Sequence, residues 1–307
     1  MLNPEDVIKQ IERISLLTAE TNVFICHSNL HALQALSLQN DSCNICLYNE
    51  AVSIKFLEKH FNGDLFAFRN EITFTKKQLY PLRKLFSLKN KKLNVFLGNK
   101  HNYWSTFIIN QLVIKNINIL DDGLSSYGIS QELFWEENVV KKISKRIVKS
   151  VFSTIGWQFF HESNNAEISR QCKAYYFFPE LVSHSSSVTK IQLDDKFFHH
   201  YSQISPVTVD NNIIHIASFE ESKRINKEGN KSENISYILH PRVVGTSADV
   251  PAEILLYRSE KVSLSASSLI LYLAFIGYKG EYVFQDGDEE SKKILSFFTT
   301  GNETKSV

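Results

Sequence analysis

The chain has 307 residues, of which 43% are hydrophobic and 22% charged, and its formal net charge is +1. This length is typical of about two domains, and the composition is that of a soluble globular protein. The near-neutral charge gives no general attraction for nucleic acid. No apolar segment is long enough to span a bilayer, and no secretory signal opens the chain, so the sequence predicts a cytoplasmic protein.

Short apolar runs recur in the first half at intervals of roughly 20–28 residues, which suits a strand, a crossover helix and the next strand. Helical patterns separate these runs. The spacing therefore predicts a parallel, doubly wound α/β sheet. The predicted strands cover residues 23–26, 45–48, 65–68, 93–97 and 117–120, and the predicted helices residues 30–38, 50–60, 76–88 and 103–114.

A helical pattern over residues 132–152 follows, and its segment 141–149 carries five Lys or Arg side chains. Apolar Ile143, Ile147 and Val151 recur at helical spacing on one face. Two interpretations stay open for this helix. It is either a solvated surface helix or a basic surface attracted to an anionic membrane or glycolipid.

A second series of apolar runs begins near residue 175, so the sequence predicts two α/β domains, 1–155 and 156–307, with a cleft between them. The polar stretch 220–233 is predicted to be an exposed loop, and the acidic tail from residue 286 becomes helical before its end. The runs of this second series lie at residues 175–178, 188–193, 213–218, 235–239, 252–257 and 267–276.

The four cysteines include one C-x-x-C motif, Cys43-Asn44-Ile45-Cys46. A structural zinc site needs further Cys or His ligands, and a redox motif would open a helix, whereas Cys46 lies in a strand pattern. The motif is therefore interpreted as buried thiols in a reducing compartment. No H-E-x-x-H, P-loop or G-x-G-x-x-G pattern occurs, and we expect no metal ion or dinucleotide cofactor.

Polar motifs follow several of the predicted strands, where ligands bind in open α/β sheets. Asp121-Asp122-Gly123 follows the run 117–120. It is either a turn or a place where one carboxylate accepts a proton from a hydroxyl. His240-Pro241-Arg242 follows the run 235–239 and could neutralise a leaving phosphate.

Two further positions could hold a nucleotide. Glu253 is predicted at the entrance of a strand, where it is either a surface carboxylate or a partner for ribose hydroxyls. Ser267 and Ser268 precede an apolar helix, and hydroxyls and amides at a helix N-terminus bind phosphate, although helix capping alone would explain one of them.

Taken in order, these motifs resemble those of bacterial sialyltransferases, and within that group the lipooligosaccharide sialyltransferase family. The likeness rests on the acid-acid-Gly motif at residues 121–123, His240-Pro241 and Ser267-Ser268, and it covers roughly residues 22 to 280. The opening segment 23–31, the strand before Arg242 and Pro251-Ala252-Glu253 also look like family motifs. One departure is Asn29, where many members have proline.

The resemblance implies a GT-B type fold of two Rossmann-like domains and inverting transfer of sialic acid from CMP-sialic acid to a galactose hydroxyl, without a cofactor. Asp121 or Asp122 would be the base and His240 would stabilise the leaving phosphate. The donor side would comprise Gly123, Pro241, Arg242, Glu253, Ser267 and Ser268, and the acceptor side Ser28 and His31.

The expected partners are a nucleotide-sugar donor and a galactose-terminated glycan of a lipooligosaccharide or capsule. Contact with the inner membrane and a homodimer are compatible with the resemblance. Two other functions remain open: a glycosyltransferase of the same fold with another nucleotide-sugar donor, and a non-catalytic protein that binds a sugar or nucleotide.

Overall fold

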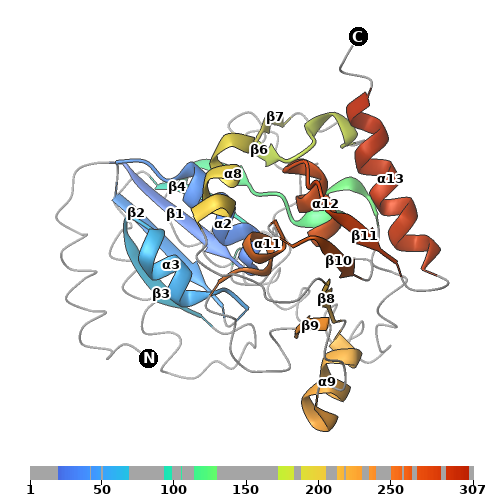
Figure 1. Cartoon of the computed structure of the whole chain (residues 1–307). Helices are drawn as coiled ribbons and strands as arrows, with labels where there is room; N and C mark the ends of the chain where they lie inside the picture. The colour runs from blue at the N-terminus through green and yellow to red at the C-terminus, as the bar shows by residue number, and fades with distance from the viewer. Residues whose placement is uncertain are drawn as a thin grey trace, which may run out of the picture.

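The computed structural model describes the parts of the chain that form two β-sheets and the helices around them (Figure 1). These parts are residues 20–41, 43–49, 51–68, 93–98, 105, 114–129, 172–182, 188–204, 213–217, 219–229, 235–239, 250–257, 259–264, 268–284 and 288–303.

The first sheet has seven strands in the order β3-β2-β1-β4-β5-β6-β7, and every neighbouring pair is parallel. The strands are β1 (Thr21–Cys26), β2 (Cys43–Tyr48), β3 (Asp64–Ala67), β4 (Leu93–Leu97), β5 (Ile114–Ile119), β6 (Cys172–Tyr176) and β7 (Thr189–Gln192). The helical elements with them are α2 (Asn29–Leu38), α3 (Ile54–His60), η2 (Gly123–Tyr127), η4 (Pro179–Leu181) and α8 (Asp195–Ile204).

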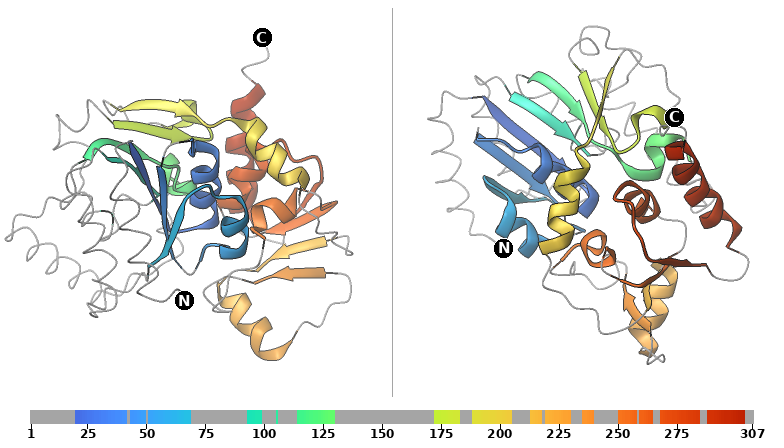
Figure 2. Two further views of the ribbon diagram at one scale, coloured as in Figure 1. Left: turned by 90° about the vertical axis from the view of Figure 1, so that its left-hand side faces the viewer. Right: turned by 45° about the horizontal axis from the view of Figure 1, so that its top comes forward.

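The second sheet has four parallel strands in the order β11-β10-β8-β9. They are β8 (Ile213–Ile216), β9 (Ile235–Ile238), β10 (Lys261–Leu264) and β11 (Glu281–Val283). The accompanying helices are α9 (Phe219–Glu228), α11 (Ala252–Leu256), α12 (Ser268–Phe275) and α13 (Glu289–Glu303). The two further views show α13 beside α12, with α9 at the far end of this sheet (Figure 2).

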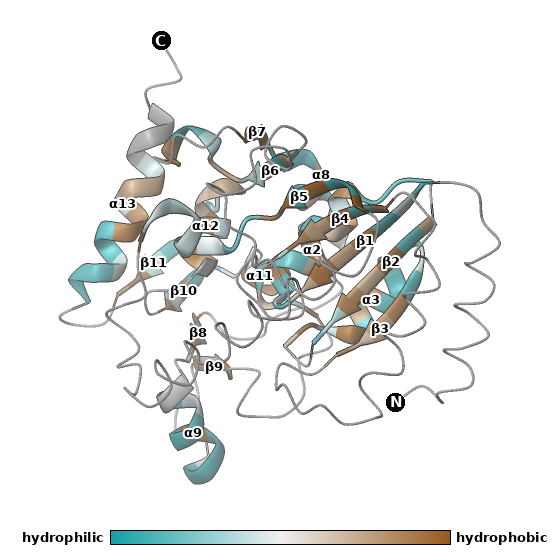
Figure 3. Ribbon diagram, turned by 180° about the vertical axis from the view of Figure 1, so that it is seen from behind, coloured by the Kyte–Doolittle hydropathy of each residue, from teal (hydrophilic) through white to brown (hydrophobic). Residues whose placement is uncertain are grey.

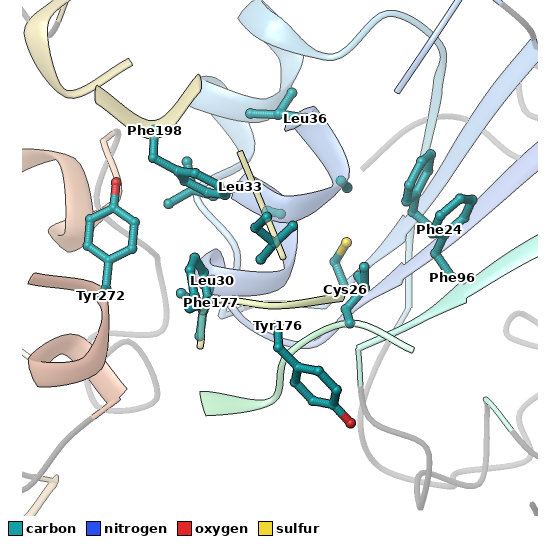
Figure 4. Packing of buried hydrophobic residues seen from close by; sticks show 14 of the residues in the cluster. Phe24, Cys26, Leu30, Leu33, Leu36, Phe96, Tyr176, Phe177, Phe198 and Tyr272 are labelled. Carbon is teal, nitrogen blue, oxygen red and sulfur yellow. The ribbon is translucent and has the colours of Figure 1, made fainter. Parts of the chain in front are cut away.

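One continuous hydrophobic core joins both sheets. Buried parallel strands read as continuous apolar runs, and β1 is buried along its whole length. Phe177, after β6, contacts Phe198 of α8 and Tyr272 of α12 with ring centroids 5.4 and 6.2 Å apart, so a helix of the second sheet is packed on the first (Figure 4). In the hydropathy colouring, β1 and β2 are mainly brown, which marks hydrophobic residues, and α9 is mainly teal, which marks hydrophilic residues (Figure 3).

A row of asparagine side chains crosses the amino ends of four strands. Asn22 lies in register with Asn44 and Asn94, and Asn94 with Asn116. Along this row each amide donates to the next oxygen at 2.7–3.2 Å. A shift by one residue would turn these side chains to the other face, so the row fixes the register, and the carboxyl ends of the strands are left for other side chains.

The predicted strands of the first half are all confirmed, as are the predicted helices that correspond to α2 and α3. The run 252–257 was predicted as a strand and is the helix α11 instead, because a short apolar run does not distinguish a buried strand from a buried helix. The predicted loop 220–233 is wrong over α9, whose charged residues form a solvated helix. The predicted helix 76–88, most of 103–114 and all of 132–152, with the basic segment 141–149, lie outside the described residues.

The change from one sheet to the other does not coincide with the predicted boundary near residue 155. β6 and β7 follow that position and still pair with the first sheet, so the sheets change between Gln192 and Ile213. The predicted boundary directly follows the helical pattern of 132–152, and the chain returns to the first sheet after it. As a division into domains, 1–155 and 156–307 stays a prediction.

The four cysteines are free thiols. Cys26 and Cys46 place their sulfur atoms 3.6 Å apart within the sheet, and burial, the largest cause, raises the pKa of Cys46. A buried protonated thiol is a poor nucleophile, which agrees with the interpretation of the C-x-x-C motif as packing. In the part of the chain that the structure describes, no helix has the length and apolar character needed to cross a membrane.

Candidate functional site

The candidate site lies where β1 and β5 end at the same edge of the first sheet. Ser28 caps α2, because its hydroxyl accepts a hydrogen bond from the His31 backbone N–H at 3.4 Å. Asn29, the departure from the family pattern, accepts a hydrogen bond from the Ser53 backbone N–H at 2.7 Å. Ser28 therefore has a capping role, and Asn29 connects α2 to the segment that leads into α3.

Asp121 is fully buried, and its carboxylate is occupied by donors of the protein itself. Oδ1 accepts from the Gly123 backbone N–H at 2.9 Å. Oδ2 accepts from the Tyr127 hydroxyl and from the Phe177 backbone N–H, the latter at 3.0 Å. Gln34 of α2 holds the Asp121 backbone on both sides, at 2.9 Å to the carbonyl and 2.8 Å from the N–H.

The electrostatics of Asp121 follow from this burial. Burial raises the pKa of Asp121 to about 6, and hydrogen bonds from Tyr127, Phe177, Ser126 and Gly123 counteract that rise. Donors that converge in this way suit an ionised carboxylate. Asp121 thus connects β5, η2 and β6, and no exposed oxygen is left on it for a substrate.

Asp122 differs from its neighbour because its side chain is 40% exposed. Its Oδ1 lies 3.1 Å from His31 Nε2, and its Oδ2 accepts from the Ser125 hydroxyl at 3.3 Å. The Ser126 hydroxyl accepts from the Asp122 backbone N–H at 2.8 Å, which fixes the turn. Of the two acids, Asp122 is the one that a hydroxyl from solvent or substrate can reach.

His31 has a defined tautomer when it is neutral. Its Nδ1 accepts from the His27 backbone N–H at 3.2 Å, so the ring proton is on Nε2, the nitrogen near Asp122. The distance to Asp122 is that of a hydrogen bond, but the N–H is not aligned with an acceptor among the described residues. The Nε2–H group therefore lies close to the Asp122 carboxylate and can also donate a hydrogen bond to a ligand oxygen there.

Gly98, after β4, makes room for the His31 ring. A Cβ atom at Gly98 would lie 2.5 Å from His31 Nδ1 and 2.7 Å from the Ile25 carbonyl oxygen. Real Cβ atoms do not approach other atoms so closely, and the carbonyl is part of a strand that cannot move. A glycine is required here because of close packing and not because of its backbone conformation.

Gly123 and Ser268 bring the two sheets together at this edge. Gly123 has a φ of +69°, which favours glycine, and a Cβ there would lie 2.0 Å from Ser268 Oγ. The same hydroxyl accepts from the Leu124 backbone N–H at 3.4 Å. Ser268 is the first residue of α12, so the acid-acid-Gly motif touches the hydroxyl motif.

Glu253 lies on α11, not at the start of a strand, and it is 8% exposed. Its Oε2 has no hydrogen-bond partner among the described residues. Burial raises the pKa of Glu253 to about 7, against smaller effects of its own backbone N–H and of His31. A surface carboxylate is thereby excluded, and the side chain is a buried acid with one oxygen to which no described residue donates a hydrogen bond.

Several predicted site residues, namely His240, Pro241, Arg242 and Ser267, lie outside the described residues. The structure brings together Asp121, Asp122, Gly123, His31, Glu253 and Ser268. Within the described ranges no group of three His, Cys, Asp or Glu side chains could hold a metal ion.

Sequence reasoning missed Gln34 and Tyr127, which both bind Asp121. Gln34 is the one amide among the buried residues of α2, which are apolar apart from Gln34 and His31, and that contrast was a usable signal. Tyr127 carries no such signal. A third omission is His215 in the second sheet, whose ring nitrogens lie 3.0 Å from the Ser263 hydroxyl and 2.9 Å from a Glu221 oxygen, so that α9 is held onto β8 and β10.

Comparisons with known proteins add one likeness. No family model matches the chain, and no curated protein does. A solved structure, the GT-B domain of a sialyltransferase from Photobacterium damselae (residues 113–497), is similar over 94% of this chain and 97% of that chain, with 13% identity and a TM-score of 0.44. We transfer no residue role from so distant a likeness. The predicted fold class, α/β of GT-B type with two Rossmann-like units, agrees with this chain's own two parallel sheets.

Proposed function

We propose that the protein is an inverting sialyltransferase that moves sialic acid from CMP-sialic acid to a terminal galactose of a lipooligosaccharide or capsule-type glycan. The observation that carries the proposal is the contact between Gly123 and Ser268. It joins the acid-acid-Gly motif of the first sheet to the hydroxyl motif of the second, and these are two of the three motifs on which the family resemblance rests.

In this proposal Asp122 is the base. The galactose hydroxyl gives its proton to the Asp122 carboxylate while its oxygen attacks the anomeric carbon of sialic acid, and the bond from that carbon to the phosphate oxygen breaks on the opposite face. His31 would direct Nε2–H toward Asp122 or the attacking oxygen. The exposure of Asp122 and its distance to His31 support this assignment, and Asp121 supports the turn.

The donor side of the proposal comes from the second half of the chain. CMP leaves with a single phosphate, whose charge His240 and the hydroxyls of Ser267 and Ser268 would stabilise. Pro241 and Arg242 would shape that phosphate site. Glu253 would accept hydrogen bonds from the ribose hydroxyls, which suits a buried carboxyl whose Oε2 has no partner in the described part of the chain. One phosphate needs less neutralisation than a diphosphate, so the reaction requires no metal ion.

An assay of CMP-sialic acid turnover tests the function. CMP release that depends on lactose, with sialyllactose as product, would support the transferase. Release without lactose would identify a hydrolase, and binding without turnover would identify a sugar- or nucleotide-binding protein. Enzyme treated with a chelator should keep its activity.

Donor identity has its own test, since a glycosyltransferase with another nucleotide-sugar donor is the second candidate. A ligand that binds only the folded state raises the melting temperature according to its occupancy. CMP should therefore stabilise the protein more than UDP or GDP. Equal or larger shifts with UDP would favour a hexosyl donor over sialic acid.

A further inference from the structure

The helix α13 follows the second sheet in sequence, but one of its side chains packs on the first sheet. Phe298 has no exposed surface. Its ring meets Tyr127 edge to face, with centroids 5.1 Å apart at 85°, and Phe178 at 5.3 Å and 32°. Tyr127 ends η2 and Phe178 follows β6, so α13 covers the carboxyl edge that carries the acidic turn (Figure 1).

Both residues that Phe298 contacts belong to the hydrogen-bond chain around Asp121. The Phe178 backbone N–H donates to the Tyr127 hydroxyl oxygen at 3.1 Å, and the Tyr127 hydroxyl donates to Asp121 Oδ2. Burial, and secondarily the charge of Asp121, raise the pKa of Tyr127, so the phenol keeps its proton. A phenol has one proton to donate, and this pair of hydrogen bonds directs the Tyr127 proton at Asp121.

We propose that Phe298 is a positioning residue for the acidic turn, residues 121–123, and acts through Tyr127. The aromatic contact fixes the plane of the Tyr127 ring, the ring fixes its hydroxyl, and the hydroxyl fixes Asp121. Asp121 in turn sets the direction of the adjoining Asp122. The proposed function enters this inference only through the activity measurements.

Helix α13 is anchored well enough to have this role. Asp288 accepts a hydrogen bond from the Ser291 backbone N–H at 3.1 Å at the start of the helix, as helix caps do. Ile294, one turn before Phe298, is also buried and shares its face, since side chains four apart lie on one side of a helix. Two turns of α13 thus hold Phe298 in place.

The chain offers a matched control at the adjoining position. Phe297 is 40% exposed, so Phe297→Leu and Phe298→Leu remove the same ring from the same helix. The third variant is Tyr127→Phe, which keeps the ring and removes the hydroxyl. The double variant of Tyr127→Phe and Phe298→Leu completes a cycle that isolates the coupling between the two side chains.

The experiment combines kinetics with the pH dependence of urea unfolding. Phe298→Leu should lower kcat roughly 10-fold or more, because small misplacements of reacting groups reduce rates strongly, while KM for CMP-sialic acid stays within about twofold of the wild-type value. Tyr127→Phe should do the same, and the double variant should be no worse than Tyr127→Phe alone. Phe297→Leu should match the wild type.

The pH dependence distinguishes positioning from simple packing. The hydrogen bond from Tyr127 lowers the pKa of Asp121, so weakening it raises the pKa. A raised folded-state pKa means that stability is lost as pH rises through that pKa. The loss of stability that Asp121 causes begins above pH 3.8 and runs through about pH 6, and it should extend to higher pH in Phe298→Leu and in Tyr127→Phe, but not in Phe297→Leu.

Independent, additive effects of the two substitutions would overturn the proposal, as would a stability loss in Phe298→Leu with an unchanged pH dependence. If the wild type transfers no sialic acid, the proposed function fails. In that case the urea unfolding of the single and double variants still measures the coupling between Phe298 and Tyr127, and its pH dependence still reports the effect on Asp121.

Discussion

Replacement of Glu253 by glutamine should make the protein more stable at alkaline pH. The pKa of Glu253 is raised from 4.5 to about 7 because its carboxyl is buried. This acid therefore contributes stability that is fully present below pH 4.5 and is lost as pH rises through 7. Roughly 2.5 pKa units at 1.36 kcal/mol each correspond to about 3 kcal/mol. Glutamine has the same shape and does not ionise.

The measurement is urea unfolding of wild type and Glu253→Gln at pH 5 and pH 8, followed by circular dichroism. At pH 5 the two proteins should differ little, because the folded Glu253 carboxyl is neutral like the amide and the carboxyl of the unfolded chain has only begun to ionise. At pH 8 the free energy of unfolding of the variant should exceed that of the wild type by about 2–3 kcal/mol. Asp121 also titrates, but it is common to both proteins and cancels. An equal difference at both pH values would refute the burial of an ionisable Glu253.

Three more predictions concern other parts of the molecule. Asp122→Asn should reduce the transfer rate by roughly 10²–10⁴-fold. CMP binding and the melting temperature should stay nearly unchanged, because the Asp122 side chain is 40% exposed. A fully active variant would show that Asp122 is not the base. Gln34→Leu should lower the free energy of unfolding by about 2–6 kcal/mol. The substitution leaves the buried N–H and carbonyl of Asp121 without a partner, and each unpaired group costs roughly 1–3 kcal/mol. An unchanged urea midpoint would contradict this prediction. The double variant Lys142→Glu, Lys145→Glu should reduce activity on a lipid-linked acceptor but not on free lactose, and added salt should do the same. Parallel losses on both acceptors would mean instead that the basic segment supports the fold or the active site.

Local patterns were sufficient for the strands because each strand of a parallel sheet is itself an apolar run. The second residues of β1, β2 and β4 are all asparagines, Asn22, Asn44 and Asn94, yet their alignment emerges only when the register is known. The run 252–257 was assigned to a strand because its length fits both a strand and a short helix. Its packing against α2, α8 and α12 decides for a helix.

The candidate site was predictable to the extent that its residues follow strands. Asp121 and Asp122 were found because polar residues at strand ends converge in α/β sheets, and Ser268 was found because it precedes an apolar helix. The burial of Asp121 beside an exposed Asp122 was not predictable, since Asp121 is held by a contact across 56 residues to Phe177. Such long-range contacts leave no periodic trace in the sequence.

The two adjoining acids show why Asp121 is an aspartate although burial makes it costly. The donors from Gly123, Tyr127 and Phe177 converge on its carboxylate, and an ionised carboxylate can accept all three of them. An asparagine has one oxygen, so either Gly123 or the pair of Tyr127 and Phe177 would face an N–H₂ group. A leucine would leave all three donors unpaired. Acceptor capacity therefore outweighs the cost of a buried charge, and the turn that Asp121 holds leaves Asp122 exposed beside His31.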